Sequence, residues 1–144
     1  MRLFYSIAND ENWWENANIE SMLVARGLTT SQLSKCADIV RTAVDNTLNC
    51  NHGKWILKSR DVAHTEYALT IKSKDDLSNI ILDRFFIENN EAWIIDYKII
   101  LDQEIKPEQY YPQLNHYNKA LSKIHTIPIN MALYFPLQKV FHVL

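Results

Sequence analysis

Glycine is scarce in this sequence, since Gly27 and Gly53 are the only two among 144 residues. They stand too far apart for the glycine-rich loops that bring backbone amides close to a phosphate, whether in a dinucleotide-binding turn or in a P-loop. We therefore expect no nucleotide cofactor bound in either of these ways.

Cysteine and long apolar runs are also scarce. Cys36 and Cys50 have no partner in a Cys-x-x-Cys pair, so a zinc or iron–sulfur site built from cysteine is not supported, and both are expected to be reduced thiols. No segment reaches the roughly 18 consecutive apolar residues of a membrane span, and the first residues lack the apolar core of a signal peptide. We expect a cytoplasmic protein with no membrane partner.

The chain lacks an excess of charge of one sign, with 15 Lys and Arg against 17 Asp and Glu. It has no overall basic footprint, so any contact with nucleic acid must be local. Hydrophobic residues make up 47% and charged residues 22%, which is the balance of a globular fold. The length predicts a single domain over 1–144, with a helical lead-in at 1–50 and a core of sheet and helix at 55–144.

The apolar periodicity predicts helices first and strands later, which is an α/β chain. Helical spacing covers 11–26 and 29–49, with Gly27 between them, and a polar break follows at 49–53. Near-alternation and β-rich composition then predict strands, and polar segments at 73–76 and 88–91 suggest hairpin turns between the first three. The expected strands are 66–72, 80–88, 92–101 and 129–135.

One further helix is expected between the third and fourth strands. Pro112 suits its first turn, and the helix should end before Pro128. Its apolar stripe consists of Leu114, Tyr117, Leu121 and Ile124.

Three charged residues in the second and third strands form the most informative cluster. Because side chains alternate along a strand, Asp96 and Lys98 should point to one face while Tyr97 points to the other. Asp83 lies one hairpin earlier and can stand beside Asp96 across the strand pair. Two close carboxylates form a hard-oxygen site for Mg²⁺ or Mn²⁺, and a nearby lysine can stabilise charge. The alternative is that Asp83, Arg84, Asp96 and Lys98 are ordinary charge pairs on a solvated sheet face.

The same segment resembles a known family. Asp83-Arg84, Trp93-Ile94-Ile95-Asp96-Tyr97-Lys98 and the series Gln113-Leu114, Tyr117, Ala120-Leu121 look like the successive motifs of the RecB/AddA-type nuclease domain. This family belongs to the PD-(D/E)xK superfamily and usually forms the C-terminal part of bacterial helicase–nucleases of the UvrD type. The resemblance covers roughly residues 60–125 in order and in spacing. It implies a restriction-endonuclease-like mixed central sheet flanked by helices, with an N-terminal helical segment.

The resemblance also implies roles for particular residues. Asp83 and Asp96 would bind the Mg²⁺ or Mn²⁺ ion, together with the carbonyl of Tyr97, and Lys98 would be the catalytic lysine. Gln113 and Tyr117 resemble a Gln-x-x-x-Tyr element that helps to hold DNA, although Tyr117 also falls on the apolar stripe, where it would pack. Glu66 matches an acid of the first strand, but a solvated carboxylate would give the same pattern.

Activity is a separate expectation from fold. The family has a metal-binding histidine upstream of these strands, and by spacing it falls at or before Met1. The resemblance therefore predicts either a DNA exonuclease that works with a helicase domain or subunit in DNA repair and recombination, or a catalytically silent module that binds DNA or a partner protein. Trp13-Trp14 favours the second alternative, since paired tryptophans can anchor an interface.

Overall fold

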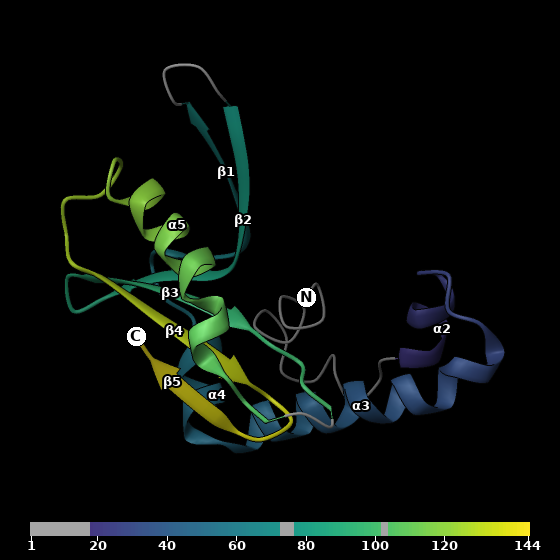
Figure 1. Ribbon diagram of the computed structural model, residues 1–144. Helices are drawn as coiled ribbons and strands as arrows, with labels where there is room; N and C mark the ends of the chain where they lie inside the picture. Colours follow the sequence, from purple (N-terminus) through teal and green to yellow (C-terminus); the bar gives the residue numbers. More distant parts are fainter. Residues whose placement is uncertain (1–17, 73–76, 102–103) are drawn as a thin grey trace.

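A computed structural model describes residues 18–72, 77–101 and 104–144 of the chain (Figure 1). Among these residues, no helix is both long and apolar enough to cross a membrane. The elements are α2 (Ile19–Val24), α3 (Thr30–Asn49), α4 (Asn51–Leu57), β1 (Ala63–Lys72), β2 (Leu77–Glu88), β3 (Glu91–Tyr97), the 3₁₀ helix η2 (Pro107–Tyr110), α5 (Tyr111–Leu121), β4 (Ile129–Phe135) and β5 (Val140–Val143).

The expected helical lead-in is present where the structure describes it. Helix α3 begins after Thr29, whose backbone N–H donates to the Gln32 side chain at 3.3 Å, so one of the unpaired amides at the helix start is satisfied. Helix α2 packs on α3 through Ile19, Leu23 and Ala37. Trp13-Trp14 and the other residues of the first expected helix up to residue 17 lie outside the described residues.

The polar break between α3 and the sheet is shorter than expected. Only Cys50 separates α3 from α4, and the segment that follows it is helical. Gly53 allows this close succession, because a Cβ at that position would stand 2.0 Å from the Thr47 carbonyl oxygen. Because Gly53 has no side chain, α4 can pack directly against the end of α3.

Within the described residues, the sheet has five strands in the order β1-β2-β3-β4-β5. The first three are antiparallel neighbours, β3 and β4 are parallel, and β4 and β5 are antiparallel. Asn89 and Asn90 join β2 to β3 with φ of 53° and 63°, as a two-residue hairpin requires, which confirms the turn predicted at 88–91. The turn predicted at 73–76 lies outside the described residues.

The end of one predicted strand and the end of one predicted helix need correction, and one strand was not predicted. Strand β3 ends at Tyr97 rather than at residue 101, because its neighbour β4 ends at Phe135 and Pro136 follows. Strand β5 was missed, since four residues give too short an apolar run to stand out. Helix α5 ends at Leu121, so Ile124, which was predicted as the last residue of the apolar stripe, lies beyond the helix and is 58% exposed.

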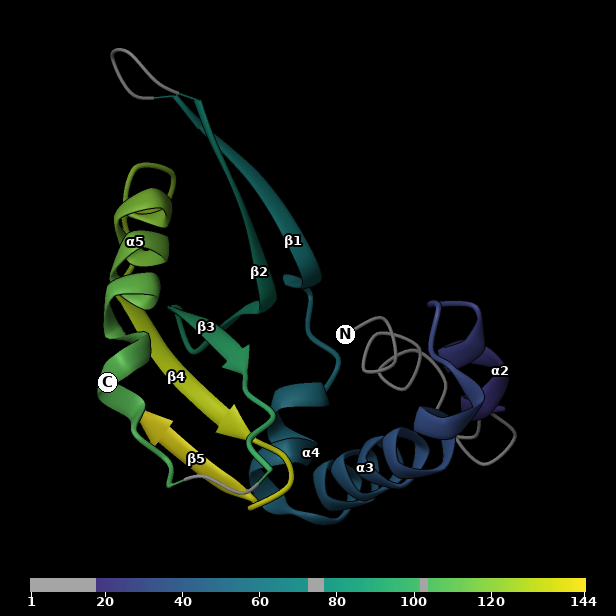
Figure 2. The ribbon, with the colours of Figure 1, turned by 45° about the vertical axis from the view of Figure 1, so that its right-hand side comes forward.

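Helices cover both faces of the central strands. Helix α5 packs on one face in a cluster that includes Leu82, Phe85 and Ile94, whereas α3 and α4 pack on the other with Phe86 and Ile95 (Figure 2). Neighbouring residues of one strand thus enter opposite cores. The protein is accordingly an α/β fold with a mixed sheet between helices.

Candidate functional site

The Asp96 and Lys98 side chains meet at the end of β3. Lys98 Nζ lies 2.5 Å from Asp96 Oδ2, while Tyr97 between them belongs to the opposite core. The alternation predicted from the sequence is therefore confirmed. Asp96 is only 4% exposed, and it reaches this burial because its register partner on β4 is Leu133 in the α5-side core.

Asp83 reaches the same place from the neighbouring strand. The pairing of β2 with β3 runs from Glu88 and Glu91 to Arg84 and Ile95, and Asp83 follows at the end of this ladder. Its Oδ2 accepts a hydrogen bond of 2.9 Å from the backbone N–H of Tyr97. The carboxylate of one strand thus rests on the backbone between Asp96 and Lys98 on the next.

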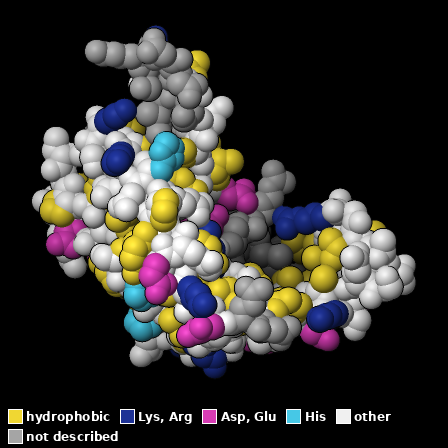
Figure 3. Space-filling model, in the orientation of Figure 1, with side chains coloured by type: hydrophobic (Ala, Val, Ile, Leu, Met, Phe, Trp, Pro, Cys, Tyr) yellow, Lys and Arg dark blue, Asp and Glu magenta, His cyan; other side chains and the backbone are white. Residues whose placement is uncertain are grey.

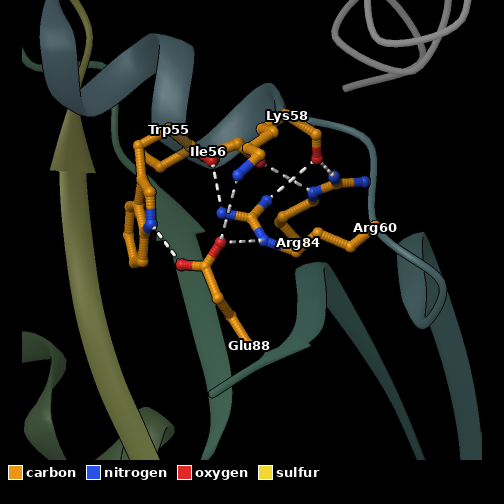
Figure 4. A network of polar contacts seen from close by, with 6 residues as sticks. All are labelled: Trp55, Ile56, Lys58, Arg60, Arg84 and Glu88. Carbon is orange, nitrogen blue, oxygen red and sulfur yellow. Dashed lines mark hydrogen bonds and ion pairs between the residues drawn. The ribbon is translucent and has the colours of Figure 1, made fainter.

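Arg84 lies in a different environment from Asp83. Its guanidinium donates to the carbonyl oxygens of Ile56 and Lys58 and to Thr65 Oγ1, each at 3.1 Å. Figure 4 shows this arginine beneath the end of α4. Arg84 and Asp96 are each 4% exposed, so neither lies on a solvated sheet face, although Asp96 does form the ion pair with Lys98 that the alternative predicted. Arg84 joins α4 to β1 and β2.

A second group of side chains extends this network. Glu88 accepts from Trp55 Nε1 at 2.6 Å and from Arg60 Nε at 3.1 Å (Figure 4). The Arg60 guanidinium also lies 3.8 Å from the centre of the Phe86 ring. These contacts hold the segment between α4 and β1 in place. Strand β1 in turn pairs with β2, which carries Asp83 and Arg84.

Burial raises the pKa of both carboxyl groups above their ordinary value. For Asp83, the Tyr97 N–H opposes the rise, the neighbouring negative charge of Asp96 adds to it, and Lys98 counteracts it. For Asp96, the hydrogen bond and positive charge of Lys98 oppose the effect of burial. The two carboxylates therefore repel each other in a site that is short of solvent.

Replacing Asp83 with Asn should test this electrostatic arrangement through folding stability. Because the folded-state pKa of Asp83 is raised from 3.8, the folded protein binds more protons than the unfolded chain above that pH. The free energy of unfolding therefore falls as pH rises through the raised pKa. Asn can accept the Tyr97 hydrogen bond without this cost. Urea unfolding from pH 3 to 7 should show the stability of Asp83→Asn relative to wild type improving with pH.

Glu88→Gln supplies the control of opposite sign. Trp55 and Arg60 lower the pKa of Glu88, so its contribution to stability is present at higher pH and is lost as pH falls through the lowered pKa. The stability of Glu88→Gln relative to wild type should therefore worsen as pH rises. A relative stability of Asp83→Asn that stays level or worsens across the range would contradict the environment described for Asp83.

The Gln113 side chain connects Lys98 to Tyr117. Its Oε1 accepts from Lys98 Nζ at 3.1 Å, and its Nε2 donates to the Tyr117 hydroxyl at 2.6 Å. The ring of Tyr117 lies in the α5-side core and only 9% of the residue is exposed. The position of Tyr117 is therefore compatible with a packing role and with a role in binding DNA. Its ring packs in the core, and its hydroxyl accepts a hydrogen bond from Gln113.

Glu66 does not join the two aspartates. It is exposed on β1, between the register pairs Thr65–Arg84 and Tyr67–Leu82, with a left-handed backbone at φ 51°. Within the described residues, no three His, Cys, Asp or Glu side chains lie close enough together to hold a metal ion.

The oxygen atoms of Asp83, Asp96 and the Tyr97 carbonyl are ligands of the kind that a hard divalent cation prefers. Asp83 and Asp96 each use Oδ2 in the contacts above, and Oδ1 takes part in neither. Repulsion between the two carboxylates, which adds to the raised pKa of Asp83, is what a cation between them would relieve. The backbone carbonyl of Tyr97 is a third oxygen on the same strand end.

Sequence reasoning missed one neighbour of this cluster. Lys98 Nζ lies 4.6 Å from the centre of the Tyr110 ring. Tyr110 precedes Gln113 by three residues, a spacing that places two side chains on one side of a helix. This spacing could have indicated that Tyr110 lies beside Gln113. The signal was weak because Pro107 and Pro112 made the start of the helix hard to place from the sequence.

The surface around these elements carries mixed charge. In Figure 3, Lys and Arg side chains are interspersed with Asp and Glu side chains on the face shown. Comparison of the chain with protein-family models and with curated proteins finds no match.

Proposed function

We propose that this chain is a metal-dependent DNA nuclease domain of the RecB/AddA type, with a restriction-endonuclease-like fold. The observation that carries the proposal is the meeting of Asp83, Asp96 and Lys98, which come from two adjoining strands and stand partly or fully buried. The mixed sheet, with its parallel β3–β4 pair joined through α5, supports the fold assignment.

Each residue has a role in phosphodiester hydrolysis. Asp83 and Asp96 would hold Mg²⁺ or Mn²⁺ with the Tyr97 carbonyl, and the bound ion supplies Lewis-acid activation of water and of the phosphate. The Lys98 ammonium lies at the edge of the site, where its side chain is 19% exposed, and can neutralise charge that develops on the phosphate. Gln113 orients Lys98 through its amide oxygen. DNA is the substrate, and a helicase domain or subunit is the proposed partner.

Replacing Asp96 with Ala should remove metal binding. Titration calorimetry with Mn²⁺ at neutral pH should detect binding by the wild-type chain and at least 100-fold weaker binding by Asp96→Ala, since even outer contacts of a metal site are worth about 10- to 100-fold. Asp96→Asn keeps the shape of the side chain and should lose the same affinity. Circular dichroism checks that both variants are folded.

Asp61→Ala is the matched control, because Asp61 is an exposed aspartate just before β1. It should bind Mn²⁺ as the wild type does. Equal affinity in Asp96→Ala and wild type would overturn the proposed metal site.

The second candidate function is a catalytically silent module that binds DNA or a partner protein. The short contact between Lys98 and Asp96 favours it, because each charge there neutralises the other. Incubation of the wild-type chain with single- and double-stranded DNA and Mn²⁺ separates the two candidates. Cleavage that depends on Lys98 excludes the silent module, whereas DNA binding without cleavage supports it.

A further inference from the structure

The ammonium group of Lys98 is contacted from three directions. Asp96 Oδ2 and Gln113 Oε1 lie at 2.5 Å and 3.1 Å, and the Tyr110 ring lies with its centre 4.6 Å away. The first two contacts belong to residues already assigned to the site. The third comes from a residue to which neither the sequence motifs nor the proposed function gives a role.

Tyr110 is held firmly by its own surroundings. It is the last residue of η2, it leads directly into α5, and its half-buried ring packs beside the core that α5 forms with the sheet. The ring centre lies 6.5 Å from that of Phe135 on β4. The ring thus has packing contacts with α5-side residues and with β4 besides its contact with Lys98.

An aromatic ring in this position adds a second attraction for the ammonium besides that of Asp96. The carboxylate draws the ammonium toward the buried end of β3, whereas the electron-rich face of a ring attracts a cation without neutralising its charge. Gln113 is exposed and offers one amide oxygen, so it restrains the ammonium weakly on its own. Removal of the ring leaves the ammonium with its contacts to Asp96 and Gln113.

We propose that Tyr110 is a positioning residue that holds the Lys98 ammonium at the edge of the site through its ring face. The catalytic value of this positioning rests on the proposed function, in which Lys98 acts on the phosphate. The contact itself exists without metal or DNA. The hydroxyl group of Tyr110 has no part in it, so phenylalanine should replace tyrosine without loss.

Nuclear magnetic resonance of the metal-free protein without DNA tests the placement. A fixed lysine over a ring has ε-methylene protons that are inequivalent and shifted upfield. These signals of Lys98 should persist in Tyr110→Phe and collapse to a single unshifted signal in Tyr110→Leu. Tyr110→Met serves as a second ring-free variant if the leucine variant does not fold. Tyr111→Leu is the matched control, because Tyr111 is the next residue and pairs with His142 instead.

Kinetics test what the positioning does. Tyr110→Leu should lower kcat about fivefold with little change in KM, as expected from the usual strength of such a contact, whereas Tyr110→Phe should match wild type. Inequivalent Lys98 signals that survive in both ring-free variants would overturn the proposal, as would equal kcat in all variants of an active enzyme. A wild-type chain that shows the expected Lys98 signals but never cleaves DNA would overturn the proposed function while the Tyr110 contact stands.

Discussion

Replacing Lys98 with Ala should lower the rate of Mn²⁺-dependent DNA cleavage by about 100- to 1000-fold, which is the loss typical of removing one group that stabilises transition-state charge. The ammonium lies at the edge of the cluster, with 19% of the side chain exposed, so it can reach a phosphate as well as Asp96 and Gln113. Because Lys98 is the ion-pair partner of the buried Asp96 carboxylate, its removal should also cost stability, and circular dichroism at the assay temperature checks that the variant is folded. Because Lys98 binds no metal in the proposal, the affinity for Mn²⁺ should stay the same or rise, since Asp96 loses its competing partner.

Steady-state cleavage of a fluorescent oligonucleotide gives kcat and KM for each variant. Lys119→Ala is the control, because Lys119 is an exposed lysine on α5. Its activity should stay within about twofold of wild type, as for an ordinary surface substitution. Lys98→Ala activity within tenfold of wild type would contradict the role assigned to Lys98, and an equal loss in Lys119→Ala would indicate a general effect of charge on DNA binding.

Replacing Arg84 with Ala should destabilise the fold by about 3 kcal/mol, because the carbonyl oxygens of Ile56 and Lys58 lose a buried charged donor. Arg84→Lys should recover only part of this loss, since an ammonium cannot present the planar fork that reaches several acceptors at once. Urea unfolding followed by circular dichroism measures both changes.

Arg41→Ala supplies the matched control. Arg41 lies on α3, and its ion pairs with Glu20 and Asp38 are exposed and at least 3.6 Å long. Such pairs contribute little, so this variant should lie within about 0.5 kcal/mol of wild type. A destabilisation below about 1 kcal/mol in Arg84→Ala would show that other donors replace the guanidinium.

Local patterns in the sequence were enough to place most of the sheet. Period-two alternation located β3 and assigned Asp96 and Lys98 to one face, because that periodicity follows from the pleat alone. The same apolar pattern continues through Ile99 and Leu101, yet these side chains are 46% and 51% exposed outside the sheet. Where a strand ends depends on the length of its neighbour, which local sequence does not reveal.

The contacts of the site were predictable only in part. The two-residue turn at Asn89-Asn90 sets the register that brings Asp83 to Tyr97, so this contact follows from local chemistry. The burial of Arg84 and the place of Tyr110 depend on how α4 and α5 dock against the sheet. The left-handed backbone of Glu66 has no signal in the residue type, because such a conformation is uncommon for glutamate.

The parallel pairing of β3 with β4 has a consequence for the order in which the site is assembled during folding. The Asp83 contact to Tyr97 closes within one hairpin, whereas Asp96 becomes shielded only when β4 arrives through the long connection that contains α5. Short loops close before long ones, so the acidic hairpin forms while its carboxylates are still hydrated. We therefore expect the energetic penalty of dehydrating Asp96 to arise when β4 pairs with β3 and α5 brings Gln113 to Lys98.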